Sequence, residues 1–443
     1  YEALSSFKAG AATAADVYEH LLGDRTINNR YDRFRDLQQL TRRKPDPQLK
    51  AHPDLPKIVE ACRDRILAVE LTRGDLPTAA TAPALSLSAI TGIPTLIRLL
   101  QNFGTEKFAR GWLRDSQSKA AVFSHLFRIS FPAEADTPAD FAKQVTAADI
   151  PAQRLIALAV YAPQWARYVE HLLRWKDLAE AVWWFHAHTK DNAWQVDQEI
   201  RDLWSAQIAE LTPLSSQDLI DGAVDVAWFQ RIYKQLKPAR WTQLDNAAKY
   251  ASGGGGHKRA QLFADSMTGK TDRAALIKRI TDKRHQDAVR ALGLLPLAGK
   301  PQSKKARADL LERYQIIQEF LRTSKKFGSQ RKASEKLAAR IGLENLARTA
   351  HFPDPQRLEW AMDREAIADL AKGPPKITIL KKGKPLKNIP AKLKKNPDIK
   401  ALQERKQSIT RQASRIRQSL EGAMCRGDKF TGAELKDLLT HPI

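Results

Sequence analysis

The chain has 443 residues, of which 73 are Lys or Arg and 50 are Asp or Glu, so its net charge is +23. This length allows two or three domains or one continuous helical array, and the two cysteines exclude a disulfide framework and favour a reducing compartment. The excess positive charge favours nucleic acid, acidic lipid headgroups or an acidic protein as partners, and it also fits a solvated surface.

The apolar runs are too short for a membrane-spanning helix, which needs roughly 20 residues. The longest run is Leu155 to Ala162, and no basic and apolar leader opens the chain. We therefore expect a cytoplasmic protein without a membrane partner. The first residue is Tyr1 rather than Met, and the chain stops at Ile443, so we expect it to be part of a longer protein.

Residues 1–150 are predicted to form a helical-repeat region made of short amphipathic helices. Asp75–Ser86 is rich in Thr, Ala and Pro and is predicted to be a linker or irregular connection. The repeated helices favour an all-α fold of the irregular α-solenoid or HEAT-like type, although no fixed-period repeat is present. Helical spacing of apolar residues occurs at Ala14–Leu22, Asn28–Leu40, Leu55–Leu71, Thr91–Phe103 and Lys119–Phe127.

Residues 151–250 are predicted to form a Trp-rich helical region. Eight of the ten tryptophans lie between Trp165 and Trp241. Their helical spacing favours a packed core in which the indole N–H groups find partners. A platform on which nucleic-acid bases stack is the alternative interpretation.

Two histidines of this region, His186 and His188, could bind a metal ion together with Asp221 and Asp225. Such a site would make the chain a metal-dependent enzyme. However, residues two apart in a helix point to different faces, which favours capping or core hydrogen bonds for these histidines. No catalytic, cofactor-binding or metal-ligating residue is therefore assigned, and no cofactor is predicted.

Residues 251–443 are predicted to form a basic helical domain that opens with four glycines, Gly253 to Gly256. Such glycines can turn backbone N–H groups toward an anion, and His257, Lys258 and Arg259 would reinforce an anion site; a flexible loop is the alternative. The nearby Gly269-Lys270-Thr271 lacks the preceding strand and first glycine of a P-loop, so nucleotide binding there is excluded.

Helical spacing continues beyond these glycines. It predicts one long helix from Thr271 to Leu292, which Gly293 ends. Asp354 is the expected cap of a later helix with Pro355 at its first position, and Thr431 with Glu434 forms a capping box that opens a final helix. The helices expected in between are Ala308–Thr323, Ser329–Ile341, Leu343–Ala350 and Pro355–Leu370.

A basic arm is predicted at residues 372–400, which contain ten lysines and one acidic residue. Its prolines exclude a continuous helix, and a short β-like run at Ile377–Leu380 suggests a hairpin or extended arm. The arm is either a solvated loop or a segment that contacts polyanions. Residues 301–443 as a whole carry 32 Lys plus Arg against 16 Asp plus Glu, or +16, which leaves +7 for the first 300 residues.

A long helix is predicted at residues 397–426, with Asn396 as its N-cap and Gly427 at its end. At 1.5 Å per residue it would be about 45 Å long. Its apolar stripe, which needs a partner surface, comprises Ile399, Leu402, Ile409, Ala413, Ile416, Leu420 and Ala423. The candidate polyanion-binding residues of the arm and this helix are Lys381, Lys382, Lys384, Lys387, Lys394, Lys395, Arg411 and Arg415.

The segment Lys283–Pro296 (KRHQDAVRALGLLP) is similar to a signature of an uncharacterised bacterial family, known as domain of unknown function 4132 or as MolR-like. The resemblance is strongest from Trp241 to the end, is weaker at Asp218–Phe229 and Trp183–His188, and includes a shorter segment than usual at Lys372–Lys382. The further matching segments are Asn345–Ala350, Asp354-Pro355, Trp360–Met362, Gly383–Leu386, Gln412–Arg415, Ser419–Met424 and Arg426-Gly427.

The resemblance implies partners rather than catalytic residues, because the family has no established active site. Its members resemble components of bacterial gene clusters that encode a MoxR-type AAA ATPase, a von Willebrand A-domain protein and a SWIM zinc-finger protein. These clusters are suspected of roles in conflict or stress. We therefore expect a non-enzymatic helical scaffold or adaptor of a multi-protein complex with the first two proteins. The alternatives are a nucleic-acid-binding protein that uses the arm and the long helix, and the metal-dependent enzyme described above.

Overall fold

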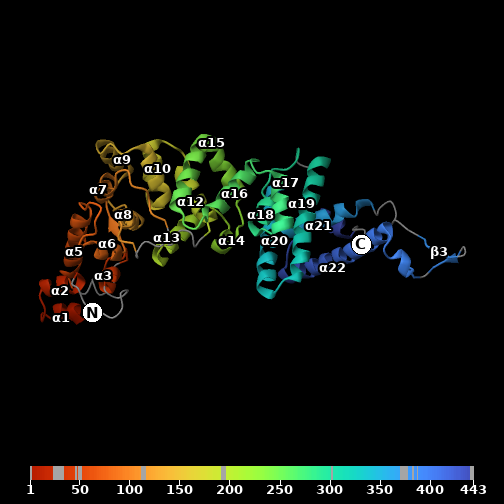
Figure 1. The fold of residues 1–443 in the computed structure, drawn as a ribbon, viewed down its shortest axis with the longest axis horizontal. Helices are drawn as coiled ribbons and strands as arrows, with labels where there is room; N and C mark the ends of the chain where they lie inside the picture. The colour runs from red at the N-terminus through yellow and green to blue at the C-terminus, as the bar shows by residue number, and fades with distance from the viewer. Residues whose placement is uncertain are drawn as a thin grey trace. The chain divides into compact units, whose positions relative to one another are not determined.

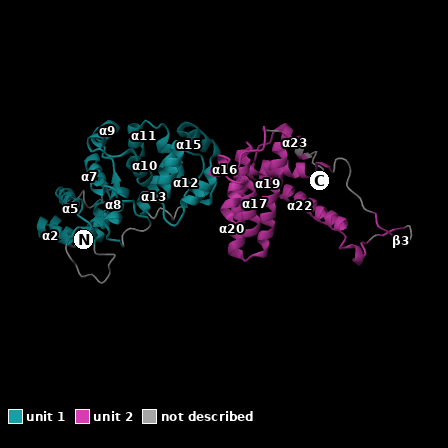
Figure 2. Cartoon of the chain, turned by 45° about the horizontal axis from the view of Figure 1, so that its top comes forward, with its two compact units in different colours: residues 1–264 teal, residues 265–443 magenta. Residues whose placement is uncertain are grey.

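The computed structural model describes residues 2–22, 34–44, 47, 52–110, 116–190, 196–300, 303–369, 378–381, 384–386 and 388–439. Within these ranges the chain is an all-α helical array, and its strands are two residues long. The chain divides into two compact units, unit 1 at residues 1–264 and unit 2 at residues 265–443 (Figure 2). The predicted regions 1–150 and 151–250 both fall in unit 1.

The first half of unit 1 consists of short helices that pack mostly against helices close to them in the chain (Figure 1). The helices predicted at Ala14–Leu22, Leu55–Leu71 and Lys119–Phe127 are confirmed to within a residue. Residues 28–33 of another predicted helix lie outside the described residues. The helices are α1 (Glu2–Lys8), α2 (Ala14–Leu22), α3 (Arg35–Leu40), α5 (Leu55–Glu70), α6 (Thr81–Ser86), α7 (Ile93–Phe103), α8 (Lys119–Arg128) and α9 (Pro138–Ala147).

The linker or irregular connection predicted at Asp75–Ser86 is found only in residues 75–80, because Thr81–Ser86 forms helix α6. A buried ion pair holds the start of this helix. The carboxylate of Glu70 is fully buried, lies 2.6 Å from the guanidinium of Arg73, and accepts hydrogen bonds from the hydroxyls of Thr78 and Thr81. These contacts join residues between 3 and 11 positions apart, and the Thr, Ala and Pro composition by itself does not reveal them.

The helix predicted from Thr91 begins two residues later, at Ile93. Ile90–Thr91 forms strand β1 instead, which pairs in parallel with strand β2 (Ser130–Phe131). Because a two-residue strand has no alternation to detect, only its pairing partner identifies it.

The second half of unit 1 is built on α12, which packs against α11, α13, α14 and α15. Helix α15 is kinked, since Lys237 has a φ of 63° and Pro238 follows it. The elements are α10 (Ala152–Tyr161), η1 (Pro163–Trp165), α11 (Ala166–Leu173), α12 (Leu178–His188), α13 (Gln198–Ala209), α14 (Ser216–Asp221), α15 (Val226–Ala251) and α16 (His257–Met267), which reaches into unit 2.

Six tryptophans of this region are buried in the described part of the chain, as their helical spacing predicts: Trp165, Trp183, Trp184, Trp204, Trp228 and Trp241. Trp184 is fully buried, and its ring centroid lies 5.3 Å from that of Trp241, which stacks on Phe185 at 4.7 Å. The expectation that the indole N–H groups find partners holds for Trp165, which donates to the carbonyl oxygen of Ser130 at 3.0 Å. It does not hold for Trp184, whose Nε1 is buried without a hydrogen-bond partner in the described residues.

Unit 2 is organised around α20, which packs against α18, α19 and α21. No helix within the described ranges is both long and apolar enough to cross a membrane. The elements are α17 (Arg273–Lys283), α18 (Gln286–Leu292), α19 (Lys304–Thr323), η3 (Ser324–Lys326), α20 (Ser329–Thr349), α21 (Pro355–Ala366), β3 (Leu380–Lys381), β4 (Lys384–Pro385), η5 (Ala391–Leu393), α22 (Pro397–Arg426) and α23 (Gly432–Leu439).

The prediction of a single helix from Thr271 to Leu292 is wrong, because the helix is interrupted at Arg284 and the segment forms two helices, α17 and α18. Arg284 has a φ of 49°, in the left-handed region that L-residues rarely adopt. Its guanidinium donates to the carboxylate of Glu335 at 2.6 Å and to the carbonyl oxygen of Phe320 at 2.7 Å. The imidazole of His285 then caps α18. Contacts with distant residues thus hold a conformation that the helical pattern does not suggest.

The two helices predicted on either side of Gly342 are one continuous helix, α20. Gly342 does not end the helix but allows α18 to approach it. A Cβ atom at Gly342 would lie 2.9 Å from the carbonyl oxygen of Val289, and one at Gly293 would lie 2.7 Å from the backbone nitrogen of Leu346. Both glycines therefore serve close packing between α18 and α20 rather than chain flexibility.

Candidate functional site

Helix α22 is the element around which the candidate site is built, and its ends agree with the sequence prediction. The side-chain oxygen of Asn396 accepts hydrogen bonds from the backbone nitrogens of Asp398 at 2.9 Å and Ile399 at 3.2 Å. Gly427 follows the helix with a φ of 71°. Both ends depend on local residues, which is why the sequence identifies them.

The apolar stripe of α22 is only partly covered by the rest of unit 2. Of the 30 residues of the helix, Ile399, Gln412 and Ala423 are buried. The other members of the stripe are intermediate in exposure, and Met424 near the end of the helix is 75 % exposed. The predicted stripe thus faces unit 2, but most of its side chains are only partly buried against it.

Polar contacts attach α22 to α21. The guanidinium of Arg415 donates to the carboxylate of Asp363 at 2.9 Å, and the carboxylate is 2 % exposed. Ser419 accepts a hydrogen bond at its hydroxyl from the indole Nε1 of Trp360 at 2.6 Å and another at its carbonyl from Gln356, also at 2.6 Å. Arg415 was predicted to face a polyanion, and in the structure it neutralises a carboxylate of its own chain.

A buried titratable cluster lies beside this contact. The hydroxyl of Tyr314 donates to Asp363 at 2.8 Å, and burial raises the pKa of Tyr314 well above its usual range. Burial also raises the pKa of the Glu359 carboxyl to about 7; the charge of Asp363 adds to this effect and Arg415 opposes it. The cluster therefore places a carboxyl that titrates near neutral pH, Glu359, beside the ion pair of Asp363 with Arg415.

The pKa of Glu359 predicts a pH dependence of stability. Because its folded-state pKa lies above the ordinary 4.5, the folded chain binds more protons than the unfolded chain between these values. The stabilising contribution is thus complete below about pH 4.5 and is lost as the pH rises through about 7. We expect the thermal unfolding midpoint of unit 2 to decrease as the pH is raised from 5 to 8. The variant Glu359→Gln should remove most of this dependence of the midpoint on pH. An unchanged slope in the variant would contradict the assignment.

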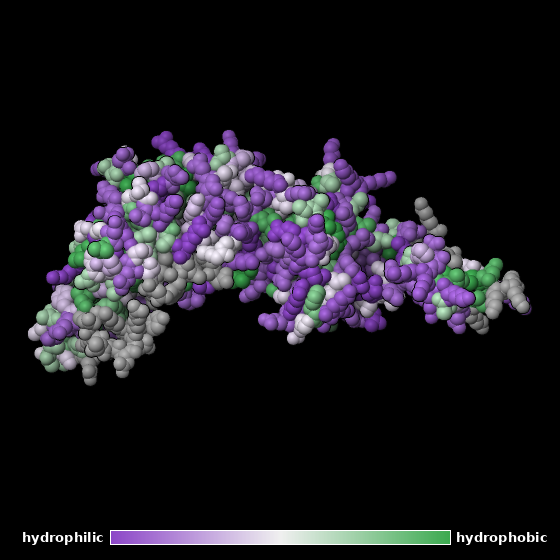
Figure 3. Space-filling view, in the orientation of Figure 1, coloured by the Kyte–Doolittle hydropathy of each residue, from purple (hydrophilic) through white to green (hydrophobic). Residues whose placement is uncertain are grey.

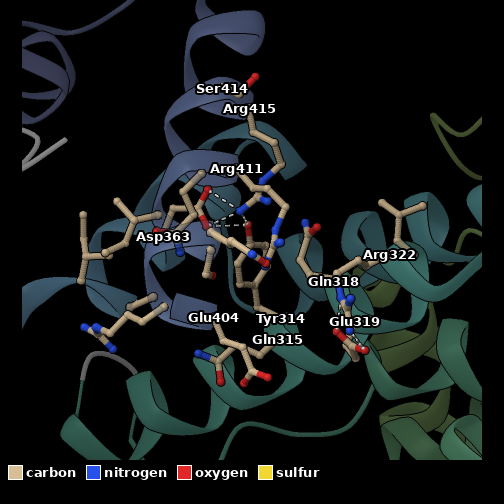
Figure 4. Close-up of a pocket in the computed structure, with 18 of the residues that line it drawn as sticks. Tyr314, Gln315, Gln318, Glu319, Arg322, Asp363, Glu404, Arg411, Ser414 and Arg415 are labelled. Carbon is tan, nitrogen blue, oxygen red and sulfur yellow. Dashed lines mark hydrogen bonds and ion pairs between the residues drawn. The ribbon is translucent and has the colours of Figure 1, made fainter. Parts of the chain in front are cut away.

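A polar groove opens between α19, the end of α21 and α22, next to this cluster (Figure 4). Its volume is about 870 Å³. The residues that border it along α22 run from Glu404 to Arg415, and Tyr314 and Asp363 also line it. No local sequence signal points to this groove, because its lining comes from three helices far apart in the chain.

Two buried polar atoms of residues that line the groove have no hydrogen-bond partner in the described residues. Gln412 is 7 % exposed, and its Oε1 has no hydrogen-bond donor among the described residues. The Nε of Arg415 is likewise buried without an acceptor in that part of the chain. Of the two arginines of α22 among the predicted polyanion-binding residues, Arg411 is exposed and contacts no carboxylate of the described chain.

Of the two forms predicted for the basic arm, a hairpin and an extended arm, the structure has the hairpin: β3 and β4 pair in antiparallel fashion with Lys381 opposite Lys384. Strand β3 begins at Leu380, the last residue of the predicted β-like run. Lys384, Lys394 and Lys395 are exposed, whereas Lys382 and Lys387 lie outside the described residues. The hairpin also carries apolar side chains, visible as a green patch at the arm in Figure 3, where Leu380 is 60 % and Leu386 37 % exposed. The arm therefore offers lysines and exposed leucines together.

Of the three residues predicted to form an anion site after the four glycines, only Lys258 is exposed. His257 begins α16 and is 7 % exposed; burial lowers the pKa of its imidazole, and Arg110 and Lys258 lower it further. Lys258 is exposed. Arg259 is buried, and its guanidinium donates to the carbonyl oxygens of His188 at 2.9 Å and Ile220 at 2.7 Å. Arg259 thus joins segments of unit 1, and an anion site would depend on the other two residues.

The structure does not bring the predicted metal ligands together. His186 is hydrogen-bonded to the carbonyl oxygen of Val160 at 2.8 Å, and Asp225 caps α15 by accepting from the backbone nitrogen of Trp228. Burial lowers the pKa of both His186 and His188 to about 3. Among the described residues, no group of three or more His, Cys, Asp or Glu, Asp221 included, is arranged to hold a metal ion. Both histidines are buried. The expected core hydrogen bond is present for His186, whereas neither ring nitrogen of His188 has a hydrogen-bond partner among the described residues.

Comparison with known proteins gives families without an assigned function. A family model described as a family of unknown function (DUF5724) matches residues 2–362, and one described as a domain of unknown function (DUF4132) matches residues 383–443. The second match covers α22 and α23, whereas the similar segments between Lys283 and Met362 fall within the first. No curated protein and no solved structure gives a significant match.

Proposed function

Since the chain belongs to the DUF5724 family of unknown function, we propose that it is a non-enzymatic helical adaptor that binds other proteins through α22 and the basic arm. The incomplete coverage of α22 is the observation that carries this proposal. A helix of 30 residues that buries three of them leaves most of its apolar stripe, including Ile409, Ile416 and Leu420, only partly covered. A partner surface would complete this burial.

As partners we propose a MoxR-type AAA ATPase and a von Willebrand A-domain protein, in a cytoplasmic bacterial complex that acts in conflict or stress. Support comes from the resemblance of residues 383–443, which contain α22. The +16 charge of residues 301–443 favours an acidic partner surface. Because the sequence lacks a P-loop, the ATPase would supply nucleotide hydrolysis and the adaptor would supply contacts.

A capture experiment with purified partners tests the proposal. Met424 on α22 and Leu76 in unit 1 are 75 % and 80 % exposed, so replacing either with Asp should leave the fold intact. We expect Met424→Asp to weaken capture of the ATPase or the A-domain protein about tenfold, since a charge would enter the contact. Leu76→Asp is the matched control and should bind like the wild type. Failure of the wild-type protein to capture either partner would overturn the proposal.

The two cysteines predict a direct measure of contact at α22. Cys62 is fully buried, and burial raises the pKa of its thiol to about 11, whereas Cys425 is exposed on α22. Because the thiolate is the reactive form, we expect alkylation at neutral pH to modify Cys425 at least about tenfold faster than Cys62. Bound partner should slow the reaction at Cys425, as measured by mass spectrometry. Unchanged labelling of Cys425 in a captured complex would place the contact elsewhere.

Nucleic-acid binding is the second candidate function, favoured by the exposed lysines of the arm. Lys384, Lys394 and Lys395 contact no carboxylate within the described residues. If these lysines contact phosphates, the slope of log K against log salt should become less steep by about 2 to 3 in a variant with all three replaced by Gln.

A triple variant outside the arm gives the control for this titration. Lys305, Lys332 and Lys336 are exposed on α19 and α20, and their replacement by Gln removes the same charge. Fluorescent duplex and single-stranded DNA would report binding. Equal losses in the two triple variants would indicate general charge attraction, and absence of binding at low salt would remove this function.

A further inference from the structure

The groove between α19, α21 and α22 has an unsatisfied donor and an unsatisfied acceptor on one face of α22. The buried Oε1 of Gln412 lacks a donor, and the buried Nε of Arg415 lacks an acceptor, within the described part of the chain. Residues three apart in a helix are neighbours on its surface. Leaving such buried groups unpaired costs about 1–3 kcal/mol each, so a ligand that satisfies both would gain affinity.

The charges of the groove are also unequally paired. Arg411 on α22 and Lys325 in η3 line the groove and contact no carboxylate of the described residues. The remaining cations of the lining have partners in the chain, which are Arg322 with Glu319, Arg405 with Asp369, and Arg415 with Asp363. The two unpaired cations therefore give the groove a surplus of positive charge.

The dimensions of the groove suit an extended segment. From Glu404 to Arg415 it follows α22 for about 16 Å at 1.5 Å per residue. An extended chain rises about 3.3 Å per residue, so roughly five residues would span this length. The volume of about 870 Å³ lies within the usual range of ligand sites.

We propose that this groove binds an extended acidic peptide segment of a partner protein. One residue of the segment donates its backbone N–H to Gln412 Oε1 and accepts from Arg415 Nε at its backbone carbonyl, because both groups of a residue point to the same side of an extended chain. Acidic side chains pair with Arg411 and Lys325. The inference rests on the proposed adaptor function and names the chemistry of its partner.

The lining distinguishes a peptide from other anions. Sulfate offers only acceptors, which leaves Gln412 Oε1 without a donor, and the phosphate dianion, with its single O–H donor, is too small to follow α22 from Glu404 to Arg415. A nucleic-acid backbone would bring successive phosphates along the whole groove, where Glu404 also lines the wall. Glu404 helps to raise the pKa of Arg322, which places its negative charge near that side chain. We therefore expect acidic side chains toward Arg411 and Lys325 and an uncharged residue beside Glu404.

Binding of the full chain to an array of random octapeptides tests the inference. On the wild-type protein we expect enrichment of Asp and Glu over Asn and Gln. Enriched peptides, labelled with fluorescein, should bind Arg411→Glu about tenfold more weakly in fluorescence anisotropy, because a repulsive charge replaces an attractive one. Lys406→Glu is the matched control: Lys406 is exposed on the same helix and does not line the groove.

The variant Gln412→Leu separates amide recognition from charge attraction. It keeps the size of the side chain and removes the acceptor, so we expect binding about threefold to tenfold weaker with no change in its salt dependence. Absence of acidic enrichment, equal loss in Arg411→Glu and Lys406→Glu, or full binding by Gln412→Leu would overturn the inference. If the wild-type protein still captures its partner proteins in any of these cases, the adaptor function stands and the groove is not its binding site. If the wild-type protein captures neither partner, the adaptor function itself is contradicted.

Discussion

Replacing Gly293 with alanine is expected to lower the free energy of unfolding of unit 2 by about 3 kcal/mol or more. Gly293 follows α18, where the added Cβ would overlap the carbonyl oxygen of Gly342 and lie 2.7 Å from the backbone nitrogen of Leu346. Both neighbours are backbone atoms of α20, so no side-chain rotation can relieve the overlap. The helices would have to move apart, which exposes Val289 and Leu292 at their contact.

Hydrogen exchange in increasing denaturant would measure this effect, with peptides from α18 and α20 as reporters. Gly328→Ala is the control, because nothing lies within 4 Å of a Cβ at Gly328 and its φ is −60°. We expect that variant to remain within about 0.5 kcal/mol of the wild type. If both variants exchange alike, the close approach of α18 and α20 does not limit stability.

Replacing Asp309 with alanine is expected to cost about 3–5 kcal/mol, because it leaves a buried guanidinium without its counter-charge. The side chain of Arg313 is 1 % exposed and lies 2.6 Å from the carboxylate of Asp309, which also pairs with Arg273. Burial lowers the pKa of Arg313, and Asp309 opposes that effect. The backbone nitrogen of Ala298 donates to the same carboxylate at 3.0 Å, so the loop before α19 would lose an anchor as well.

Glu312→Ala provides the comparison, since Glu312 also lies on α19 and pairs with Arg273 at 2.7 Å but is 57 % exposed. We expect it to cost less than about 1 kcal/mol, as is usual for exposed ion pairs. Denaturant unfolding followed by hydrogen exchange in α19 would separate the two variants. Similar stabilities for both would mean that Arg313 is satisfied by the carbonyl oxygens of Leu295 and Pro296 alone.

The parts of the fold that the sequence predicts well depend on neighbours in the chain. The capping box of α23 is an example: Thr431 and Glu434 exchange hydrogen bonds of 2.7 Å and 3.2 Å, as their spacing predicts. Asp354 likewise caps α21 by accepting from the backbone nitrogen of Arg357. These interactions span three residues, so the pattern of residue types contains them completely.

The candidate site shows the opposite case. The sequence pattern assigns Arg411 and Arg415, on one basic helix, both to polyanions. In the structure Asp363, from a different helix, neutralises Arg415, whereas Arg411 pairs with no carboxylate of the described residues. Gln412, whose amide oxygen is the buried acceptor of the groove, had no distinguishing feature in the sequence. Its role follows from burial, which depends on how α22 lies against α19 and α21.

The sequence by itself thus determined the all-α class, the helix at 397–426 with both of its ends, the Trp core and the excess of positive charge in residues 301–443. The hydrophobic periodicity, the helix caps and the composition are properties of neighbouring residues in the sequence, and they do not depend on how the helices pack against one another. Only the tertiary structure decided the break at Arg284, the continuity of α20 through Gly342 and the pairing of Arg415. Each of these depends on an atom from a distant segment, whose position no local pattern contains.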